Sequence, residues 1–158
     1  MRLCRAVLPH MLARGHGAIV NVSSIGGLVP SGGNVTYSGT KAFLVGFTRA
    51  LDFELRSTGV RVQVLCPGFT RTGIYDRAEL RPLHIAQHVP DWLWMSADQV
   101  VDASLSALAR KMVVCIPGWR NRLLVVGGQL GLAPLMSVFV QRATGLDHPL
   151  RSAGSSHG

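Results

Sequence analysis

The sequence is poor in acidic side chains and in cysteine. Only 8 Asp and Glu residues stand against 16 Lys and Arg residues, which gives a formal net charge of +8. This imbalance favours contact with anions such as phosphate, nucleic acid or acidic lipid, without selecting among them. The three cysteines, Cys4, Cys66 and Cys115, are odd in number and far apart, which excludes a disulfide framework and a Cys/His metal box. We therefore expect reduced, mostly buried thiols, no metal ion and a cytoplasmic protein.

Further absences narrow the class of protein. The first residues include arginines but no apolar stretch of signal-peptide length and no small-residue cleavage site, so secretion is not expected. The arginines are scattered rather than clustered into a groove, so we expect no nucleic-acid partner. Against these absences, 47% of the 158 residues are hydrophobic and 15% are charged. That composition is typical of one globular domain with a hydrophobic core.

Hydrophobic spacing predicts helices that alternate with strands. Residues 1–14 and 36–57 have helical spacing, and a third helix is predicted from 97 to 110 with Ser96 at its N-terminal cap. Apolar runs at 18–22, 60–66 and 112–116 predict strands, the first of them buried on both faces. This order indicates an α/β fold of right-handed βαβ units with a parallel sheet. Residues 69–95 are mixed in composition and predict a partly helical lid or pocket wall.

One long stretch near the C-terminus carries no charge. Residues 123–140 are interrupted by glycines and a proline, and their length is at the lower limit for crossing a bilayer. We favour a hydrophobic helix pair that packs on the sheet or on another subunit, and contact with a membrane surface is the alternative. The predicted organisation is a main domain over 1–118, a hydrophobic helical segment over 119–146, and a disordered tail over 147–158.

Three polar residues have the spacing of an acid–base site. Tyr37 and Lys41 are four residues apart at a predicted helix start, so both side chains project from one face. Ser24 follows the first predicted strand, at the edge where open α/β sheets bind ligands. An ammonium one turn away, together with the positive helix N-terminus, favours the phenolate form of the tyrosine. Tyr37 could then exchange a proton with an alcohol or carbonyl oxygen that the Ser24 hydroxyl holds in place.

Each of these pieces alone has an ordinary structural explanation. A tyrosine at a helix start usually packs against neighbours, and paired serines usually form turns. Together, however, these features favour a catalytic site. They are a strand, the residues Asn-Val-Ser-Ser, a glycine turn, Tyr-x-x-x-Lys at a helix start, and a second strand that ends in Pro-Gly.

In these segments the sequence resembles the short-chain dehydrogenase/reductase family. Residues 17–27 resemble the family's active-site serine segment, residues 37–42 its catalytic tyrosine and lysine, and residues 64–72 its Pro-Gly segment. The resemblance covers residues 1 to about 118. It implies a Rossmann-like, doubly wound parallel sheet, with NADP or NAD as the cofactor, and it does not discriminate between the two.

The resemblance also implies a role for each matching residue. Ser24 would polarise the substrate carbonyl, Tyr37 would be the acid/base, and Lys41 would hold the nicotinamide ribose. Tyr37 and Lys41 would therefore contact the cofactor as well as act in catalysis. The nicotinamide and pyrophosphate side would be lined by Pro67, Gly68, Thr70 and Thr72. The expected reaction is hydride transfer between the nicotinamide and a carbonyl or secondary alcohol.

Substrate and assembly are less closely defined. The segment 71–95 would set the substrate, and its Trp92, Leu93 and Trp94 indicate a small apolar molecule. By resemblance to the family, the long helix at 36–57 is a candidate face for a homo-oligomer.

The sequence also departs from the family pattern. No strand with a glycine-rich turn precedes Ser24, and the glycines of Gly15-His16-Gly17 follow a helix instead. The family's Asn-Ala-Gly segment and the asparagine of its catalytic tetrad are also absent. We therefore expect a partial Rossmann-like sheet without its N-terminal strands, from a truncated gene model in which Met1 is internal to a longer frame. The alternatives are an inactive truncated remnant, or a non-enzymatic fragment that binds a membrane surface or a partner.

Overall fold

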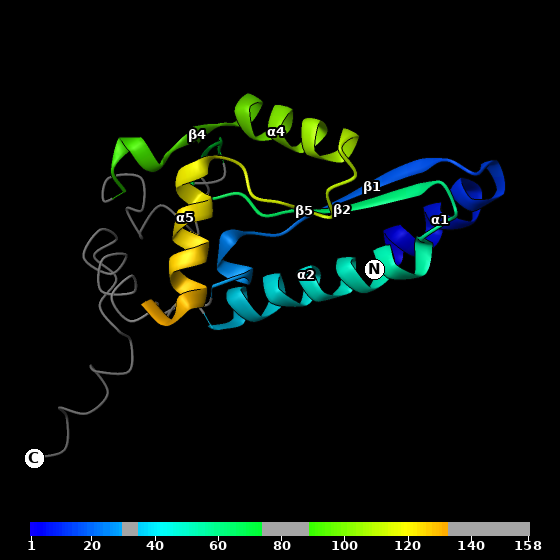
Figure 1. Cartoon of the computed structure of the whole chain (residues 1–158), viewed down its shortest axis with the longest axis horizontal. Coiled ribbons are helices and arrows are strands. Elements are labelled where there is room, and N and C mark those ends of the chain that lie inside the picture. Colours follow the sequence, from blue (N-terminus) through cyan, green and yellow to red (C-terminus); the bar gives the residue numbers. More distant parts are fainter. Residues whose placement is uncertain (30–34, 74–88, 133–158) are drawn as a thin grey trace, which may run out of the picture.

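A computed structural model describes residues 1–29, 35–73 and 89–132 of the chain (Figure 1). Helices and strands alternate in this part of the molecule, as the hydrophobic spacing predicts. In chain order the elements are α1 (Arg2–Arg14), β1 (Gly17–Val22), the 3-10 turn η1 (Ile25–Gly27), α2 (Val35–Leu55), β2 (Val60–Leu65), β3 (Thr70–Arg71), the 3-10 turn η4 (Asp91–Leu93), β4 (Met95–Ser96), α4 (Ala97–Ala109), β5 (Val114–Cys115), α5 (Trp119–Gly127) and η5 (Gly128–Leu132).

The central strand of the sheet is β2. The strand order is β1-β2-β5, and both neighbours run parallel to β2. The register pairs Gly17 with Val60 and continues to Val22 with Leu65, so β1 and β2 end side by side. The segments that follow these two strands therefore start at the same edge of the sheet, where parallel sheets bind ligands. The predicted α/β fold with a partial parallel sheet is confirmed.

The helices cover both faces of the sheet. Val62 and Val64 of β2 belong to clusters with residues of α1 and α2, whereas Leu65 and Gln63 contact residues of α4. Figure 1 shows α1 and α2 on one side of the sheet and α4 on the other. The chain crosses the sheet in the same direction from β1 to β2 and from β2 to β5. The first connection passes over one face of the sheet through α2, and the second passes over the other face through α4. One connection is therefore right-handed and the other is left-handed.

The prediction of right-handed units therefore holds for at most one of these two connections. The second is not a simple helical crossover, because it also contains β3 and β4, which pair with each other in a separate two-stranded sheet.

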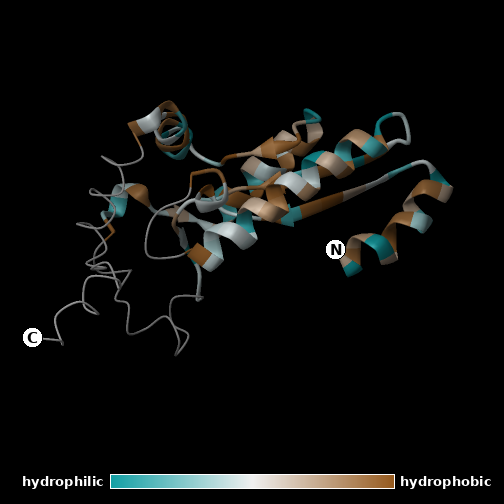
Figure 2. Cartoon of the chain, turned by 90° about the horizontal axis from the view of Figure 1, so that it is seen from below, coloured by the Kyte–Doolittle hydropathy of each residue, from teal (hydrophilic) through white to brown (hydrophobic). Residues whose placement is uncertain are grey.

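Most of the apolar core lies between the sheet and the two helices α1 and α2. Ile19, Leu51, Leu55 and Val62 form one buried cluster with Cys4, at the end of the sheet where the strands begin. Burial of each aliphatic side chain of this size stabilises the fold by about 1.5–3 kcal/mol. Figure 2 shows hydrophobic and hydrophilic residues alternating along α1 and α2, as expected for helices with one face on a sheet.

One face of β1 is open, which corrects the prediction that this strand is buried on both faces. Ile19 is buried, but Val20 is 37% exposed and Val22 is 55% exposed. The cause is the position of α4, which contacts β2 and β5 on that face, while α1 and α2 cover only the opposite face of β1. Within the described residues, β1 is also an edge strand, with β2 as its one neighbour.

The predicted cap of α4 is confirmed. The Ser96 hydroxyl accepts a hydrogen bond from the Gln99 backbone N–H at 3.1 Å, and the Gln99 side chain accepts one from the Ser96 N–H at 3.0 Å. This reciprocal capping box satisfies two backbone donors of the first turn. Of the predicted lid over 69–95, the described residues form β3, η4 and β4, and residues 74–88 lie outside the described part of the chain.

Helix α5 begins directly after residue 118. α5 and η5 expose several apolar side chains, namely Leu123, Val126, Leu130 and Leu132. In the part of the chain that the structure describes, no helix has both the length and the apolar character needed to cross a bilayer. Residues 133–146 and the predicted disordered tail at 147–158 lie outside that part. The domain division at residue 118 and the helix-pair interpretation stay predictions.

Candidate active site

Ser24 occupies a turn directly after β1. Its backbone is extended, and its hydroxyl accepts a hydrogen bond from the Gly26 N–H at 3.1 Å, which caps the short η1 turn. The preceding residue, Ser23, is 3% exposed and donates its hydroxyl to the backbone carbonyl of Lys41 at 2.8 Å. The serine pair therefore joins the end of β1 to the first turns of α2.

Tyr37 and Lys41 lie in the first two turns of α2. The Lys41 Nζ is 5.7 Å from the centroid of the Tyr37 ring, so the cation lies beside the phenol as the four-residue spacing predicts. The same ammonium donates to the carbonyl oxygen of Val22 at 3.1 Å. Tyr37 is 43% exposed, so its ring is open to a ligand.

Gly26 and Gly27 bring these residues together. A Cβ placed on Gly26 would lie 3.5 Å from Cε1 of Tyr37 and 3.6 Å from the Ser24 hydroxyl, so the ring and the hydroxyl border the same glycine. At Gly27, a Cβ would lie 2.6 Å from the backbone carbon of Lys41, a distance that real side chains do not adopt. The turn approaches α2 this closely because Gly27 lacks a side chain, whereas a Cβ at Gly26 would make only ordinary van der Waals contacts. The three predicted catalytic residues thus gather at one place.

The Pro67-Gly68 segment lies next to the serine turn. Pro67 follows the end of β2, and its carbonyl accepts a hydrogen bond from the Ile25 N–H at 3.0 Å. The Thr70 hydroxyl donates to the carbonyl of Gly68 at 3.2 Å. Thr72 is exposed just after β3. The structure therefore joins the Pro-Gly segment to the serine segment by a direct backbone bond.

Comparison with known proteins shows the family of the chain. Residues 1–81, just over half of the chain, match the family described as short chain dehydrogenase. The chain belongs to the short-chain dehydrogenase family. It is 36% identical over 104 residues to 2-(R)-hydroxypropyl-CoM dehydrogenase of Xanthobacter autotrophicus, covering 63% of this chain and 41% of that enzyme. It is 35% identical over 132 residues to 3-oxoacyl-[acyl-carrier-protein] reductase of Bos taurus, covering 84% of this chain and 52% of the relative.

A solved structure extends the similarity to the fold. The short-chain dehydrogenase from Sphingobium yanoikuyae in complex with NADPH superposes with a TM-score of 0.64 and 35% sequence identity, over 86% of this chain and 51% of that one. The chain thus spans about half the length of the relatives it matches.

All three thiols of the chain are free and buried, as predicted. Cys66, next to Pro67, has no exposed surface. Burial is the largest effect on its thiol and raises the pKa to about 11, although a hydrogen bond with Ser23 acts in the opposite direction. Burial likewise raises the pKa of Cys115. Neither thiol has the lowered pKa of a reactive cysteine.

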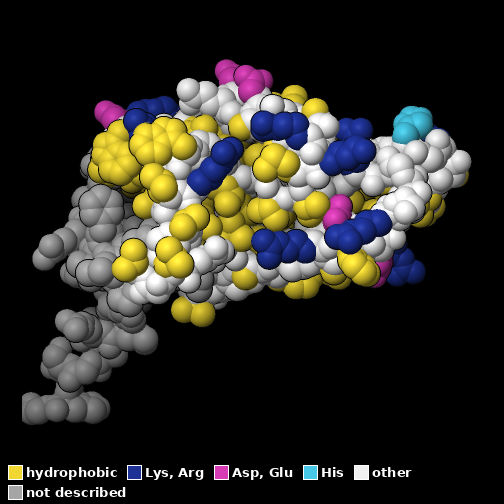
Figure 3. Space-filling view, in the orientation of Figure 1, with side chains coloured by type: hydrophobic (Ala, Val, Ile, Leu, Met, Phe, Trp, Pro, Cys, Tyr) yellow, Lys and Arg dark blue, Asp and Glu magenta, His cyan; other side chains and the backbone are white. Residues whose placement is uncertain are grey.

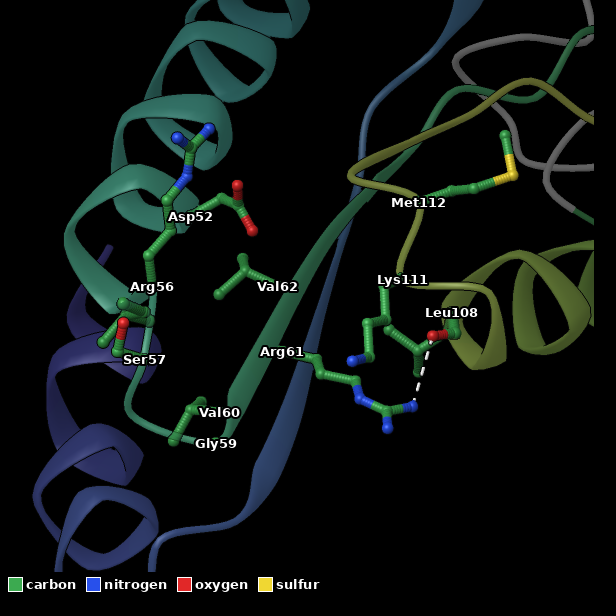
Figure 4. A pocket seen from close by; sticks show the side chains of 11 residues that line it. Asp52, Arg56, Ser57, Gly59, Val60, Arg61, Val62, Leu108, Lys111 and Met112 are labelled. Atoms are coloured by element: carbon green, nitrogen blue, oxygen red, sulfur yellow. Dashed lines mark hydrogen bonds between the residues drawn. The ribbon is translucent and has the colours of Figure 1, made fainter.

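A pocket lies where β2 begins, at the opposite end of that strand from Pro67 (Figure 4). It has a volume of about 360 Å³, and three of its lining residues are the cations Arg56, Arg61 and Lys111. Arg56 directly follows α2, Lys111 lies two residues beyond the end of α4, and Arg61 donates to the carbonyl of Leu108 at 3.4 Å. Cations at helix C-termini balance the negative end of the helix dipole, so this cluster has a structural explanation. Figure 3 shows Lys and Arg spread among apolar side chains over one face of the molecule.

Two contributors to the site were not predicted from the sequence. Ser23 carries the bond to α2 that holds Lys41 in place, whereas the sequence indicated only turn chemistry at this position. The buried amide of Asn121 lies against Gly68, and no local pattern around Asn121 signals this contact.

Proposed function

We propose that this chain supplies the catalytic and nicotinamide-side part of an NAD(P)-dependent oxidoreductase. The reaction is hydride transfer between the nicotinamide and a carbonyl or secondary alcohol. The observation that supports this function best is the convergence at Gly26, where the Ser24 hydroxyl and the Tyr37 ring border one glycine while the Lys41 ammonium lies beside the ring.

The residues present fit the nicotinamide half of the cofactor. An ammonium has three donors, and among the described contacts the Val22 carbonyl takes one of them, so Lys41 can also hold ribose hydroxyls. We assign the nicotinamide ring a place against the Gly68 backbone beside the serine turn, on the side away from the Asn121 carboxamide, which fills the space of the missing side chain. We assign cofactor contacts to Tyr37, Lys41, Pro67, Gly68, Thr70 and Thr72. The choice between NADP and NAD stays open.

Each catalytic side chain has one task in this proposal. When bound, the nicotinamide cofactor would supply or accept a hydride at the substrate carbon. In the reductive direction Tyr37 gives its phenolic proton to the oxygen of the carbonyl, and in the oxidative direction the phenolate removes the proton of the alcohol. Ser24 donates a hydrogen bond to the same oxygen and stabilises its developing negative charge. Lys41 stabilises the phenolate by its positive charge.

The substrate we propose is a small apolar carbonyl compound or alcohol. Trp92 is 49% exposed in η4 and offers an apolar surface, while Phe69 and Trp94 pack together with ring centroids 5.6 Å apart. The names of the relatives, a hydroxypropyl-CoM dehydrogenase and a 3-oxoacyl reductase, support a carbonyl or alcohol substrate. We further propose the cytoplasm as the site of action.

A homo-oligomer contact through α2 is also part of the proposal. Phe43 and Phe53 of this helix are 51% and 68% exposed, an apolar surface of the kind that subunit contacts cover.

Cofactor titration tests the function directly. NADPH and NADH are added to the recombinant 158-residue chain while the cofactor's fluorescence is recorded, and we expect saturable binding in the micromolar range. Ser24→Ala should keep this binding but lose turnover of small ketones, because the Ser24 hydroxyl contacts the substrate oxygen. Ser106→Ala, an exposed serine of α4, is the matched control and should keep both. Absence of saturable binding would instead favour an inactive remnant.

A further inference from the structure

Asn121 is an unusual residue for its position in α5. Its neighbours Arg120 and Arg122 are exposed, yet Asn121 is only 3% exposed. The side-chain amide donates a hydrogen bond to the carbonyl of Pro117 at 2.8 Å, and its nitrogen lies 3.6 Å from the sulfur of Met95. A buried amide is costly unless it is hydrogen-bonded, and these contacts hold the Asn121 side chain in one orientation.

The side-chain carboxamide of Asn121 lies against Gly68. A Cβ added to Gly68 would collide with the Asn121 carboxamide, with Cγ and Nδ2 both at 2.8 Å. Cβ atoms essentially never approach other atoms so closely, so position 68 accepts only glycine while Asn121 is in place. The glycine and the asparagine are complementary in shape, although they belong to different elements.

Two backbone hydrogen bonds flank the contact. On one side of Gly68, the Pro67 carbonyl accepts from Ile25 N–H at 3.0 Å, next to Ser24. On the other side, the Phe69 carbonyl accepts from Met95 N–H at 3.0 Å. Met95 in turn contacts the Asn121 amide. Gly68, Phe69, Met95 and Asn121 therefore form a closed ring of contacts.

We propose that Asn121 is a positioning residue that sets the backbone of Pro67 and Gly68 against the serine segment. It does not touch the reacting atoms. It acts through Gly68, by limiting how far this backbone can move away from Ile25 and Ser24. The consequence for cofactor binding rests on the proposed function, whereas the consequence for the backbone does not.

Amide hydrogen exchange of the full chain without cofactor tests the backbone part. Asn121→Ala should accelerate exchange of the Ile25 and Met95 amides by about tenfold or more, because the bonds flanking Gly68 open more often. The Ser23 and Cys66 amides, which donate to Leu65 and Cys115, should stay at the wild-type rate. Ser104→Ala is the matched control, since Ser104 is 5% exposed and hydrogen-bonds Gln63 on another part of the sheet. Equal acceleration of all four amides, or none, in Asn121→Ala would overturn the proposal.

A double-mutant cycle tests the link to the cofactor. Gly68→Ala should weaken NADPH binding about tenfold or more, because the new Cβ pushes the segment away from Asn121. Adding Asn121→Ala to Gly68→Ala removes the colliding atoms and should restore part of the lost NADPH affinity. If the two substitutions act independently, the double variant will bind NADPH more weakly still, which would contradict the proposal. If the wild-type chain binds no nicotinamide cofactor, the proposed function fails, and the exchange rates still decide the role of Asn121.

Discussion

The ammonium of Lys41 is hydrogen-bonded to the carbonyl oxygen of Val22, the last residue of β1, at 3.1 Å. This bond fixes the cation beside the Tyr37 ring, at the point where the sheet ends and α2 begins. The strand end therefore determines where the positive charge of the site lies.

Replacing this lysine should affect cofactor binding and turnover together. We expect Lys41→Met to weaken NADPH binding by about tenfold or more, because a charge-assisted hydrogen bond to the ribose is lost. Lys111→Met is a matched control, since Lys111 is the one other lysine of the sequence and is exposed after α4. Fluorescence titration of both variants gives the comparison. Wild-type affinity in Lys41→Met would contradict the assignment.

The close approach of η1 to α2 predicts a strong effect of one methyl group. Gly27→Ala should lower the free energy of unfolding by about 1–3 kcal/mol, because the added Cβ meets the backbone of Lys41 and Ala42. Gly46→Ala, in the middle of α2 with no atom within 4 Å of its Cβ position, should raise it by about 0.5–1 kcal/mol. Urea unfolding measures both changes. A Gly27→Ala variant as stable as Gly46→Ala would show that the approach is not close.

The buried thiol of Cys66 predicts a loss of stability at alkaline pH. Its pKa in the folded chain is about 11, above the ordinary value of 9.0 that applies when the chain unfolds. The unfolded state therefore releases this proton first, and the stabilisation that is complete below pH 9.0 is lost as the pH rises towards about 11.

Comparison with Cys66→Ala isolates this effect from other groups that titrate at alkaline pH. Between about pH 8 and pH 10.5, urea unfolding of the wild-type chain should lose stability more steeply than the variant does. Parallel curves for the two proteins would mean that Cys66 ionises equally well in the folded and unfolded chain.

Much of the fold can be predicted from the sequence because the signals are local. The capping box needs only Ser96 and Gln99, three residues apart, and Tyr37 and Lys41 share one helix face by spacing alone. Periodicity likewise places α1, α2 and the strands, with boundaries that shift by one or two residues at most ends.

Features that depend on tertiary packing could not be predicted in this way. The apolar run Ala18-Ile19-Val20 is the same whether one face or both are covered, so the open face of β1 has no local signal. The opposite hands of the two connections follow from where α4 packs. The contact of Asn121 with Gly68 joins residues far apart in the chain, and nothing in either segment alone indicates the other.

The most direct test of the proposed chemistry is the rate of NADPH or NADH oxidation by the wild-type chain and by Tyr37→Phe, with a panel of small apolar ketones. Removal of the phenolic hydroxyl takes away the proton donor and leaves the ring in place. We predict turnover by the wild-type chain, a fall in kcat of about 100-fold or more in Tyr37→Phe, and a far smaller change in the Kd for the cofactor, because the ring stays in place. Turnover by Tyr37→Phe at the wild-type rate would contradict the role of Tyr37 as the acid/base.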